Sequence, residues 1–296
     1  MAEHFTDYSE FILQAQSRCI RYKPKQQSGL PLVSICIPVR NAARTIERAI
    51  ESILDQSYPA IELVVVDGGS SDGTLETLMG FEKIDILYTG SDKNAEEAIN
   101  RAICLSTGNL FCIVGADDWI TRDHISHCVS RLIEAKADLV IPALAMVTEN
   151  VTDFLALDKL KSTVMYEMPV LPGIGWVATR KLFETVGLFN TSIKVASDFD
   201  FLLRAVRAGS TIDYEPNIYY HHTTGGNSMV SPIRTLFDTR RVVISNGGHV
   251  IVANAYFLKW VAKLFIRLAL QKLVPARVYG FIVRHASRRR STSSTS

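Results

Sequence analysis

Short apolar runs alternate with stretches of helical periodicity from residue 32 onwards. Residues 33–37 and 61–66 are apolar and rich in β-branched side chains, which is typical of strands buried on both faces. Between them, residues 42–54 place apolar side chains at helical spacing. The pattern continues with an expected helix from residue 75, a strand over 84–88, a helix over 95–105 and an apolar run over 112–114. It predicts an α/β fold with a mostly parallel sheet flanked by helices.

Polar side chains follow three of these apolar runs. Arg40 and Asn41 follow the first strand, Asp67 to Asp72 the second, and Asp117 and Asp118 the run over 112–114. Consecutive parallel strands end at one edge of a sheet, so these clusters should converge there. Two adjacent carboxylates repel each other, which indicates a cation or a hydroxyl-rich ligand nearby. Asp-Asp is also a common turn and N-cap sequence, and that alternative stays open at this point.

The glycines after the second strand match none of the common nucleotide or calcium motifs. Gly68, Gly69 and Gly73 permit a close approach of the backbone to a ligand, but no Lys-Ser/Thr pair follows and the dinucleotide spacing is absent. Asp67 and Asp72 are not spaced as in a calcium loop. A simple glycine-rich turn is the alternative to a ligand-binding loop.

Composition describes an ordinary globular protein of 296 residues, with 47% hydrophobic and 21% charged residues. The formal net charge of +2 provides no global basic field for nucleic acid, so we expect no nucleic-acid partner. Five cysteines without paired metal-ligand spacing favour a reducing compartment. Residues 1–22 contain no apolar core of a secretory signal, so a cytoplasmic location is expected.

Three motifs, in residues 33–41, 62–74 and 116–118, closely resemble the opening of family 2 glycosyltransferases with the GT-A fold, in both order and spacing. The resemblance extends from about residue 32 to about residue 231 and implies a Rossmann-like sheet, a nucleotide-sugar donor and inverting transfer in polysaccharide biosynthesis. By this resemblance the nucleotide pocket would be lined by Pro38, Val39, Arg40, Asn41, Asp67 and Gly68. Of these, Asp67 would accept a hydrogen bond from the base, which suits uracil.

The resemblance also assigns residues near the diphosphate. Lys93 looks like the lysine of an Asp-Lys-Gly motif, with Asn94 in place of the glycine, although an exposed turn lysine is the alternative. Asp117 and Asp118 look like the acids that bind Mg²⁺ or Mn²⁺, and one of them, taken as Asp117, would also contact the donor. The fuller family pattern has another acid where Gly115 stands, which leaves the number of protein ligands open.

The second half, from about residue 172 to residue 204, is similar to the acceptor half of the same family, and Asp198 matches its general base. An inverting transfer independently needs a carboxylate that takes the proton of the acceptor hydroxyl. Ser197 and Asp198 also suit an N-cap and a first-turn acid, where the helix dipole would keep the Asp198 pKa low. Trp176 could stack on an acceptor sugar or lie in the core. His221 and His222 are candidates for the acceptor side, a phosphate or the metal, with a polar loop as the alternative.

Residues 249–283 are strongly apolar, and Lys259, Lys263 and Arg267 recur every four residues. The longest uninterrupted apolar stretch is shorter than the ~20 residues that a membrane-spanning helix needs. We therefore expect a helix in the membrane surface, with the arginines of residues 284–290 attracted to anionic lipid. Packing on the catalytic domain, or a dimer, is the alternative.

These patterns divide the chain into a helical appendage and linker (1–30), a GT-A domain (31–232, with a nucleotide-sugar half at 31–142 and an acceptor half at 143–232), an amphipathic helical region (233–290) and a disordered tail (291–296). The predicted function is metal-assisted transfer of a sugar, most simply from a UDP-sugar, to a hydroxyl of a glycan or lipid-linked acceptor. The protein would be cytoplasmic or peripheral on the cytoplasmic face of the membrane. Two rivals are a catalytically inactive nucleotide-sugar-binding or scaffold protein and a sugar nucleotidyltransferase, whose glycine-rich loop with a following basic residue is missing.

Overall fold

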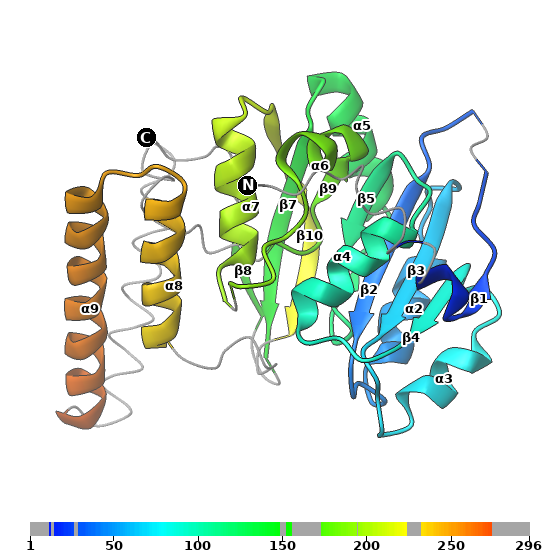
Figure 1. Cartoon of the computed structure of the whole chain (residues 1–296), viewed down its shortest axis with the longest axis horizontal. Helices are drawn as coiled ribbons and strands as arrows, with labels where there is room; N and C mark the ends of the chain where they lie inside the picture. Colours follow the sequence, from blue (N-terminus) through cyan, green and yellow to red (C-terminus); the bar gives the residue numbers. More distant parts are fainter. Residues whose placement is uncertain are drawn as a thin grey trace.

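A computed structural model describes residues 12, 15–26, 29–148, 152–155, 173–193, 195–223 and 232–273. They form a ten-stranded sheet in the order β1-β4-β3-β2-β5-β9-β7-β10-β6, with β8 paired to β7 (Figure 1). The strands are β1 (Cys19–Tyr22), β2 (Val33–Val39), β3 (Ile61–Asp67), β4 (Ile86–Thr89), β5 (Leu110–Ile113), β6 (Trp119–Ile120), β7 (Leu139–Val147), β8 (Thr152–Leu155), β9 (Val177–Thr179) and β10 (Ile212–Thr223).

The first half of the sheet follows the sequence prediction. β4, β3, β2 and β5 are parallel neighbours, and the register places Val39 opposite Asp67 where β2 and β3 end. Their side chains are almost all buried, as expected for a parallel sheet covered on both faces. The polar residues that follow β2 and β3 therefore meet at one edge.

Beyond this parallel block the sheet is mixed. β9 runs antiparallel to both of its neighbours, β5 and β7, while β7 and β10 form a second parallel pair. β1, β6 and β8 are also antiparallel to their partners. β9 has three residues and β6 has two, which is too short for a hydrophobic period to identify either of them.

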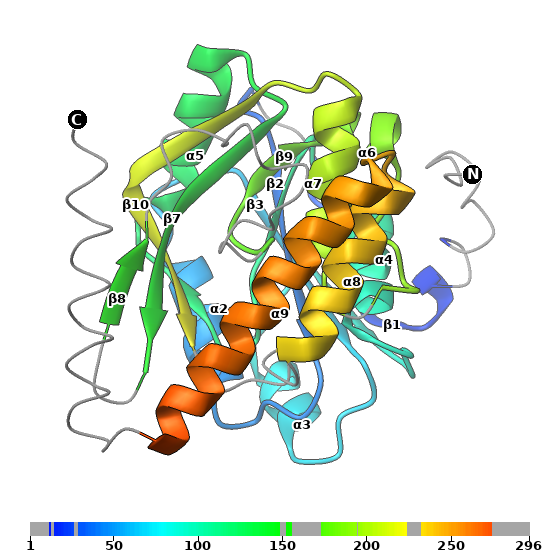
Figure 2. The ribbon, with the colours of Figure 1, turned by 90° about the vertical axis from the view of Figure 1, so that its left-hand side faces the viewer.

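Helices cover both faces of the sheet. α4 packs against β2 and β3 on one side, whereas α5 packs against β7 and β10 on the other, as Figure 2 shows. α4 coincides with the helix predicted over residues 95–105. The helices are α2 (Ile46–Leu54), α3 (Thr74–Gly80), α4 (Ala95–Leu105), α5 (His124–Ala135), α6 (Arg180–Val186), α7 (Ser197–Arg207), α8 (Pro232–Ser245) and α9 (Val250–Leu273).

Part of the expected N-terminal appendage belongs to the sheet. β1 pairs antiparallel with β4 and closes that edge of the sheet. The Arg21 guanidinium donates to the carbonyls of Phe81 (2.6 Å) and Ile84 (3.1 Å), just before β4. In β1 the apolar Ile20 and Tyr22 are exposed and Arg21 is partly buried, so no apolar alternation in the sequence indicated this strand.

α8 and α9 form an antiparallel hairpin at the far end of the molecule from β1 (Figure 1). A small second core joins α7, α8 and α9 through Phe199, Leu203, Val242, Val243 and Ala253. None of the helices in the described part of the chain combines the length and apolar character needed to cross a bilayer. The arginines of residues 284–290 and the tail at 291–296 lie outside the described residues.

Candidate active site

The first two polar clusters are joined by hydrogen bonds at the carboxyl edge of the sheet. The backbone N–H of Asn41 donates to Ser70 Oγ (2.8 Å), and the backbone N–H of Ser71 donates to the side-chain oxygen Oδ1 of Asn41 (2.9 Å). Asn41 has a φ of 53°, in the left-handed region that asparagine tolerates better than most residues. The Gly68 N–H donates to the Val39 carbonyl (2.8 Å). The predicted convergence of the loops after β2 and β3 is therefore present.

Asp67 is fully buried at the end of β3. Its carboxylate accepts hydrogen bonds from Ser70 Oγ (2.5 Å) and Thr89 Oγ1 (2.9 Å), so it ties the loop after β3 to the end of β4. Of the other predicted pocket residues, Val39 is buried, Pro38 is partly buried and Arg40 is exposed. Arg40 and Asn41 are thus the exposed side chains at the end of β2.

The segment before α4 places Asp92 inside and Lys93 outside. Asp92 is buried and accepts two hydrogen bonds on Oδ1 from the Arg101 guanidinium (3.0 and 2.8 Å). Burial raises the Asp92 pKa against the effect of this pair, and the carboxylates of Glu97 and Asp67 act in the same direction. Lys93 is exposed, as either of its sequence interpretations allows. The predicted site residues included Lys93 but not Asp92, whose pKa is influenced by the charge of Asp67.

Asp118 is held by the end of β10. Its Oδ2 accepts from the Tyr220 hydroxyl (2.6 Å) and lies 3.2 Å from His222 Nδ1, while Oδ1 accepts from the Thr223 N–H (2.8 Å). The side chain is 1% exposed. His221 and His222 therefore do not follow the strand in a loop: β10 continues through Thr223, and His222 contacts the acidic pair directly.

Asp117 is the more open member of the pair. Burial raises its pKa, and the negative charge of Asp118 adds to the shift. Burial by itself would lower the His222 pKa, but the hydrogen bond to Asp118 and its charge outweigh that effect and raise it. Two neighbouring carboxylates of this kind favour a cation nearby.

The donor atoms available to a divalent ion are few. Within the described ranges, no three His, Cys, Asp or Glu side chains are arranged to hold a metal ion. Asp118 already accepts three hydrogen bonds, so Asp117 is the acid of the pair that a cation can reach without rearrangement. A hard octahedral ion bound here would need most of its oxygens from phosphates and water, an arrangement usual for Mg²⁺ at phosphate sites.

Three stacked side chains, one of them from α2, lie next to the acidic pair. The Arg48 guanidinium lies 3.9 Å from the centre of the Trp119 ring, and Trp119 stacks on His221 with ring centres 4.9 Å apart. Arg48 also donates to the Asp117 carbonyl (2.6 Å). Arg48 and Trp119 were not among the predicted site residues. Arg48 lies on the exposed face of an amphipathic helix, and nothing in the sequence indicates its contact with Asp117, 69 residues away.

Asp198 lies in the first turn of α7 and is partly buried. Its carboxylate accepts hydrogen bonds from the backbone N–H groups of Gly173 (2.9 Å) and Phe199 (2.7 Å). Burial nevertheless raises the Asp198 pKa to about 6, although both hydrogen bonds lower it. The expectation that the helix dipole keeps this pKa low was wrong because desolvation of the charge dominates. The N-cap is Ala196, so the Ser197 side chain does not cap the helix.

The loop before β9 connects the base candidate to the acidic pair. Gly173 contacts Asp198, and a Cβ at Gly173 would lie 2.4 Å from the Asp198 Cβ. Two residues later, Gly175 packs against the ring of Tyr220, whose hydroxyl contacts Asp118. Trp176, the next residue, is buried among core side chains, in agreement with the packing alternative, and its ring is no open platform for a sugar.

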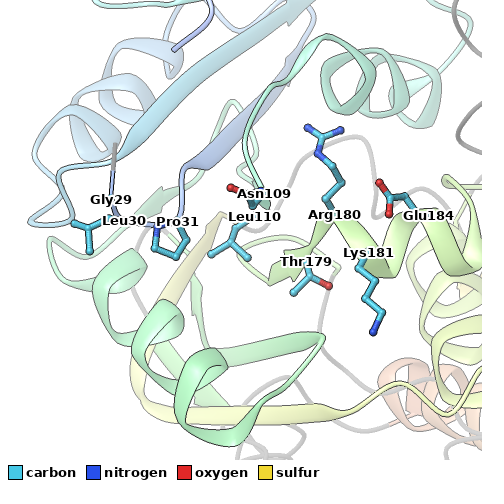
Figure 3. A pocket seen from close by; sticks show the side chains of 9 residues that line it. All are labelled: Gly29, Leu30, Pro31, Asn109, Leu110, Thr179, Arg180, Lys181 and Glu184. Carbon is cyan, nitrogen blue, oxygen red and sulfur yellow. The ribbon is translucent and has the colours of Figure 1, made fainter. Parts of the chain in front are cut away.

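A cavity of about 830 Å³ lies elsewhere, near the starts of β2 and β5 (Figure 3). It is lined by Gly29, Leu30, Pro31, Asn109, Leu110, Thr179, Arg180, Lys181 and Glu184. None of the predicted donor, metal or base residues faces it. Because ligands of α/β sheets bind at the carboxyl ends of parallel strands, we place the active site at the acidic edge rather than in this cavity.

The fold and the acidic edge together define a glycosyltransferase of the GT-A type, which confirms the expected fold and enzyme class. The sequence profile of glycosyl transferase family 2 matches residues 34–187, more than half of the chain, and the chain belongs to this family.

Individual relatives agree with this assignment. The chain is 28% identical over 223 residues to an uncharacterized glycosyltransferase of Rickettsia typhi, covering 71% of this chain and 68% of the relative. It is 31% identical over 185 residues to a PGL/p-HBAD biosynthesis glycosyltransferase of Mycobacterium bovis, covering 59% of this chain and 69% of the relative.

Two solved structures share the fold at 18% identity and a TM-score of 0.62 each. One is TarS of S. aureus in complex with UDP-GlcNAc; the matched region covers 83% of this chain and 77% of the TarS chain. The other is the mannosyltransferase PcManGT from Pyrobaculum calidifontis in complex with GDP-Man and Mn2+, which covers 96% and 88%.

Proposed function

We propose that the protein is an inverting glycosyltransferase in which Asp198 is the general base. The observation that carries the proposal is the position of Asp198, whose carboxylate is fixed by two backbone N–H groups and connected through the loop of Gly173 and Gly175 to Tyr220 and Asp118. A base on one side and an acidic pair on the other side of one connected edge is what a direct displacement at an anomeric carbon requires.

Asp198 takes the proton of the acceptor hydroxyl as the oxygen attacks the anomeric carbon. A pKa of about 6 suits this role, because the carboxylate is deprotonated at neutral pH and is a stronger base than an ordinary aspartate. The two N–H donors orient the carboxylate before the acceptor arrives.

The donor is a nucleotide-diphosphate sugar, and we favour UDP over GDP as its nucleotide. Solved neighbours bind UDP, UDP-GlcNAc and GDP-Man, which supports the donor class but not one nucleotide. The preference for UDP depends on Asp67, whose carboxylate would accept from the uracil ring N–H. Pro38, Val39, Arg40, Asn41 and Gly68 would complete the pocket, with Lys93 near the diphosphate.

Mg²⁺ or Mn²⁺ is the proposed cofactor, held by Asp117, with Asp118 as the second predicted ligand. The Mn2+ in the PcManGT complex supports a divalent ion in this fold. When bound, such an ion offsets the negative charge that grows on the departing diphosphate. His222, beside Asp118, is positioned to share in this neutralisation by donating a proton or a hydrogen bond.

The acceptor is proposed to be a hydroxyl of a glycan or of a lipid-linked sugar, presented at a membrane surface. Support comes from α9, where Ile251, Leu258 and Phe265 recur every seven residues and are 72%, 63% and 61% exposed. On another face of the same helix, the Lys263 ammonium lies 4.4 Å from the centre of the Trp260 ring. A helix with one exposed apolar stripe and with lysine and tryptophan on its other faces suits a position in a lipid interface.

The central experiment compares Asp198→Asn with the wild-type protein for sugar transfer and for donor binding. UDP-sugars and GDP-sugars are first screened by thermal shift with Mn²⁺, since a bound donor raises the melting temperature. The variant should bind the selected donor within about twofold of wild type and lose transfer by a factor of about 10² or more. Equal loss of binding and transfer would reject the assignment of the base.

A further inference from the structure

A second carboxylate, that of Glu96, contacts the residue immediately before Asp198. Glu96, in the first turn of α4, is 8% exposed. Its Oε1 accepts a hydrogen bond from the hydroxyl of Ser197 (2.9 Å), the residue immediately before Asp198. The first turns of α4 and α7 are therefore joined by a partly buried side-chain contact between residues 101 positions apart.

The acceptor in this contact is a buried, ionisable carboxyl group. Burial raises the Glu96 pKa, and the Ser197 hydroxyl and the backbone N–H of Glu96 partly offset this. A neutral asparagine or glutamine would accept the Ser197 proton at a lower desolvation cost. A buried acid next to a second acid is costly unless the charge has a use.

The charged groups around Asp198 can be assigned element by element. From α4, the negative charge of Glu96 disfavours the charged form of Asp198 and so raises the Asp198 pKa. From the loop before β9 the contact is the uncharged N–H of Gly173. On α7 itself, Asp200 is paired with Arg204 (2.9 Å) and accepts from Asn246 (2.8 Å), so its charge is already compensated.

We propose that Glu96 is a positioning residue for Asp198, which fixes the first turn of α7 through Ser197 and places a second negative charge beside the Asp198 carboxylate. The inference rests on the proposed role of Asp198 as the base. Its two parts are separable, because the hydrogen bond and the charge can be removed independently. Glu96 then adjusts the proton affinity of the base without contacting the substrate.

Two substitutions separate the parts. Glu96→Gln removes the charge and keeps an oxygen that accepts from Ser197, whereas Ser197→Ala removes the hydrogen bond and keeps the charge. The protonation midpoint of Asp198 is measured by NMR on protein labelled with ¹³C at the aspartate carboxyl carbon, with the Asp198 signal assigned from its absence in Asp198→Asn. The rate of UDP release from UDP-GlcNAc is followed over the same pH range. Glu82→Gln, on an exposed turn far from the site, is the matched control.

Glu96→Gln should lower the Asp198 midpoint by about half a pH unit or more, with the acidic limb of the UDP-release profile moving with it. Ser197→Ala should lower the plateau rate several-fold while its midpoint stays closer to wild type than that of Glu96→Gln. An unchanged midpoint in Glu96→Gln, or an equal change in Glu82→Gln, would overturn the inference. Failure of the proposed function is a different result, namely UDP release that survives Asp198→Asn, and the NMR midpoint is measurable whether or not the protein turns over this donor.

Discussion

The Tyr220 hydroxyl donates to Asp118 Oδ2 at 2.6 Å, across 102 positions of the chain. The Tyr220 hydroxyl oxygen also accepts a hydrogen bond from the Gly115 N–H (2.9 Å), so one buried hydroxyl fixes both the acidic pair and the turn that precedes it. Tyr220 lies in β10, whereas Asp118 directly precedes β6. The acidic pair therefore depends on two segments that are far apart in the sequence.

Tyr220→Phe should destabilise the protein and disturb the acidic pair. It leaves the Gly115 N–H and one acceptor position of Asp118 unsatisfied in a buried setting, which costs about 2–4 kcal/mol in the free energy of unfolding. Urea unfolding measures this loss, and isothermal titration with UDP and Mn²⁺ should show weaker binding. Tyr219→Phe is the matched control, and an equal loss of stability in both variants would contradict the role of the Tyr220 hydroxyl.

Gly175 should tolerate no side chain, because of its backbone conformation and because the Tyr220 ring is close. A comparison with Gly209, which shares only the backbone conformation, separates the two effects. Its φ is 76°, and a Cβ would lie 2.2 Å from Cδ2 of the Tyr220 ring. Gly209 has a φ of 74° but open space around it. Gly209→Ala should cost about 1 kcal/mol from backbone strain alone, and Gly175→Ala about 3–5 kcal/mol because the ring must also move. Equal costs, measured by urea unfolding, would show that the ring adapts freely.

The sequence predicted the elements whose signals are local. α4 was placed with its observed bounds, and β2 and β3 were recognised because nearly every residue in them is apolar. The convergence of Arg40–Asn41 with the loop after Asp67 followed from the topology of parallel strands alone. These features depend on periodicity and chain order, which a single sequence contains.

The features that the sequence could not predict depend on contacts between distant segments. β9 is antiparallel because it is inserted between two parallel blocks, and three residues give no period to detect. The raised pKa of Asp198 depends on burial by the loop before β9 and on Glu96, neither of which the residues around Asp198 reveal. Arg48, Asp92 and Tyr220 were missed for the same reason.

The rate of transfer should fall as the pH is lowered through about 6. The base must be deprotonated, and the pKa of Asp198 is raised by burial to about 6, so the acidic limb should lie about two units above that of an ordinary aspartate. Measurement of kcat with saturating donor between about pH 4.5 and 8 tests this. An acidic limb near pH 4 would mean that the carboxylate is solvated during turnover.

The same shift should make Asp198 a source of instability at neutral pH. Its folded-state pKa lies above its unfolded value, so the folded protein binds the proton more tightly and loses stability as the pH rises from about 4 to about 6. Between about pH 4.5 and 7.5 this loss amounts to about 2 kcal/mol, and Asp198→Asn should abolish it. Urea unfolding of both proteins at both pH values gives the difference, in which the effect of the altered hydrogen bonds cancels. Parallel pH dependence in the two proteins would contradict the burial argument.

The exposed stripe of α9 should bind anionic lipid surfaces. Leu258→Glu combined with Phe265→Glu places two charges on this face, so co-sedimentation with vesicles of phosphatidylserine and phosphatidylcholine should fall about tenfold or more, because insertion of apolar side chains is lost and the new charges are repelled. Ile133→Glu on α5, where the isoleucine is 57% exposed, is the matched control and should bind as wild type does. Higher salt should weaken wild-type binding through screening of Lys259 and Lys263. If the wild-type protein ignores vesicles and the double variant instead changes its mass in solution from dimer to monomer, the stripe is an interface between two copies of the chain.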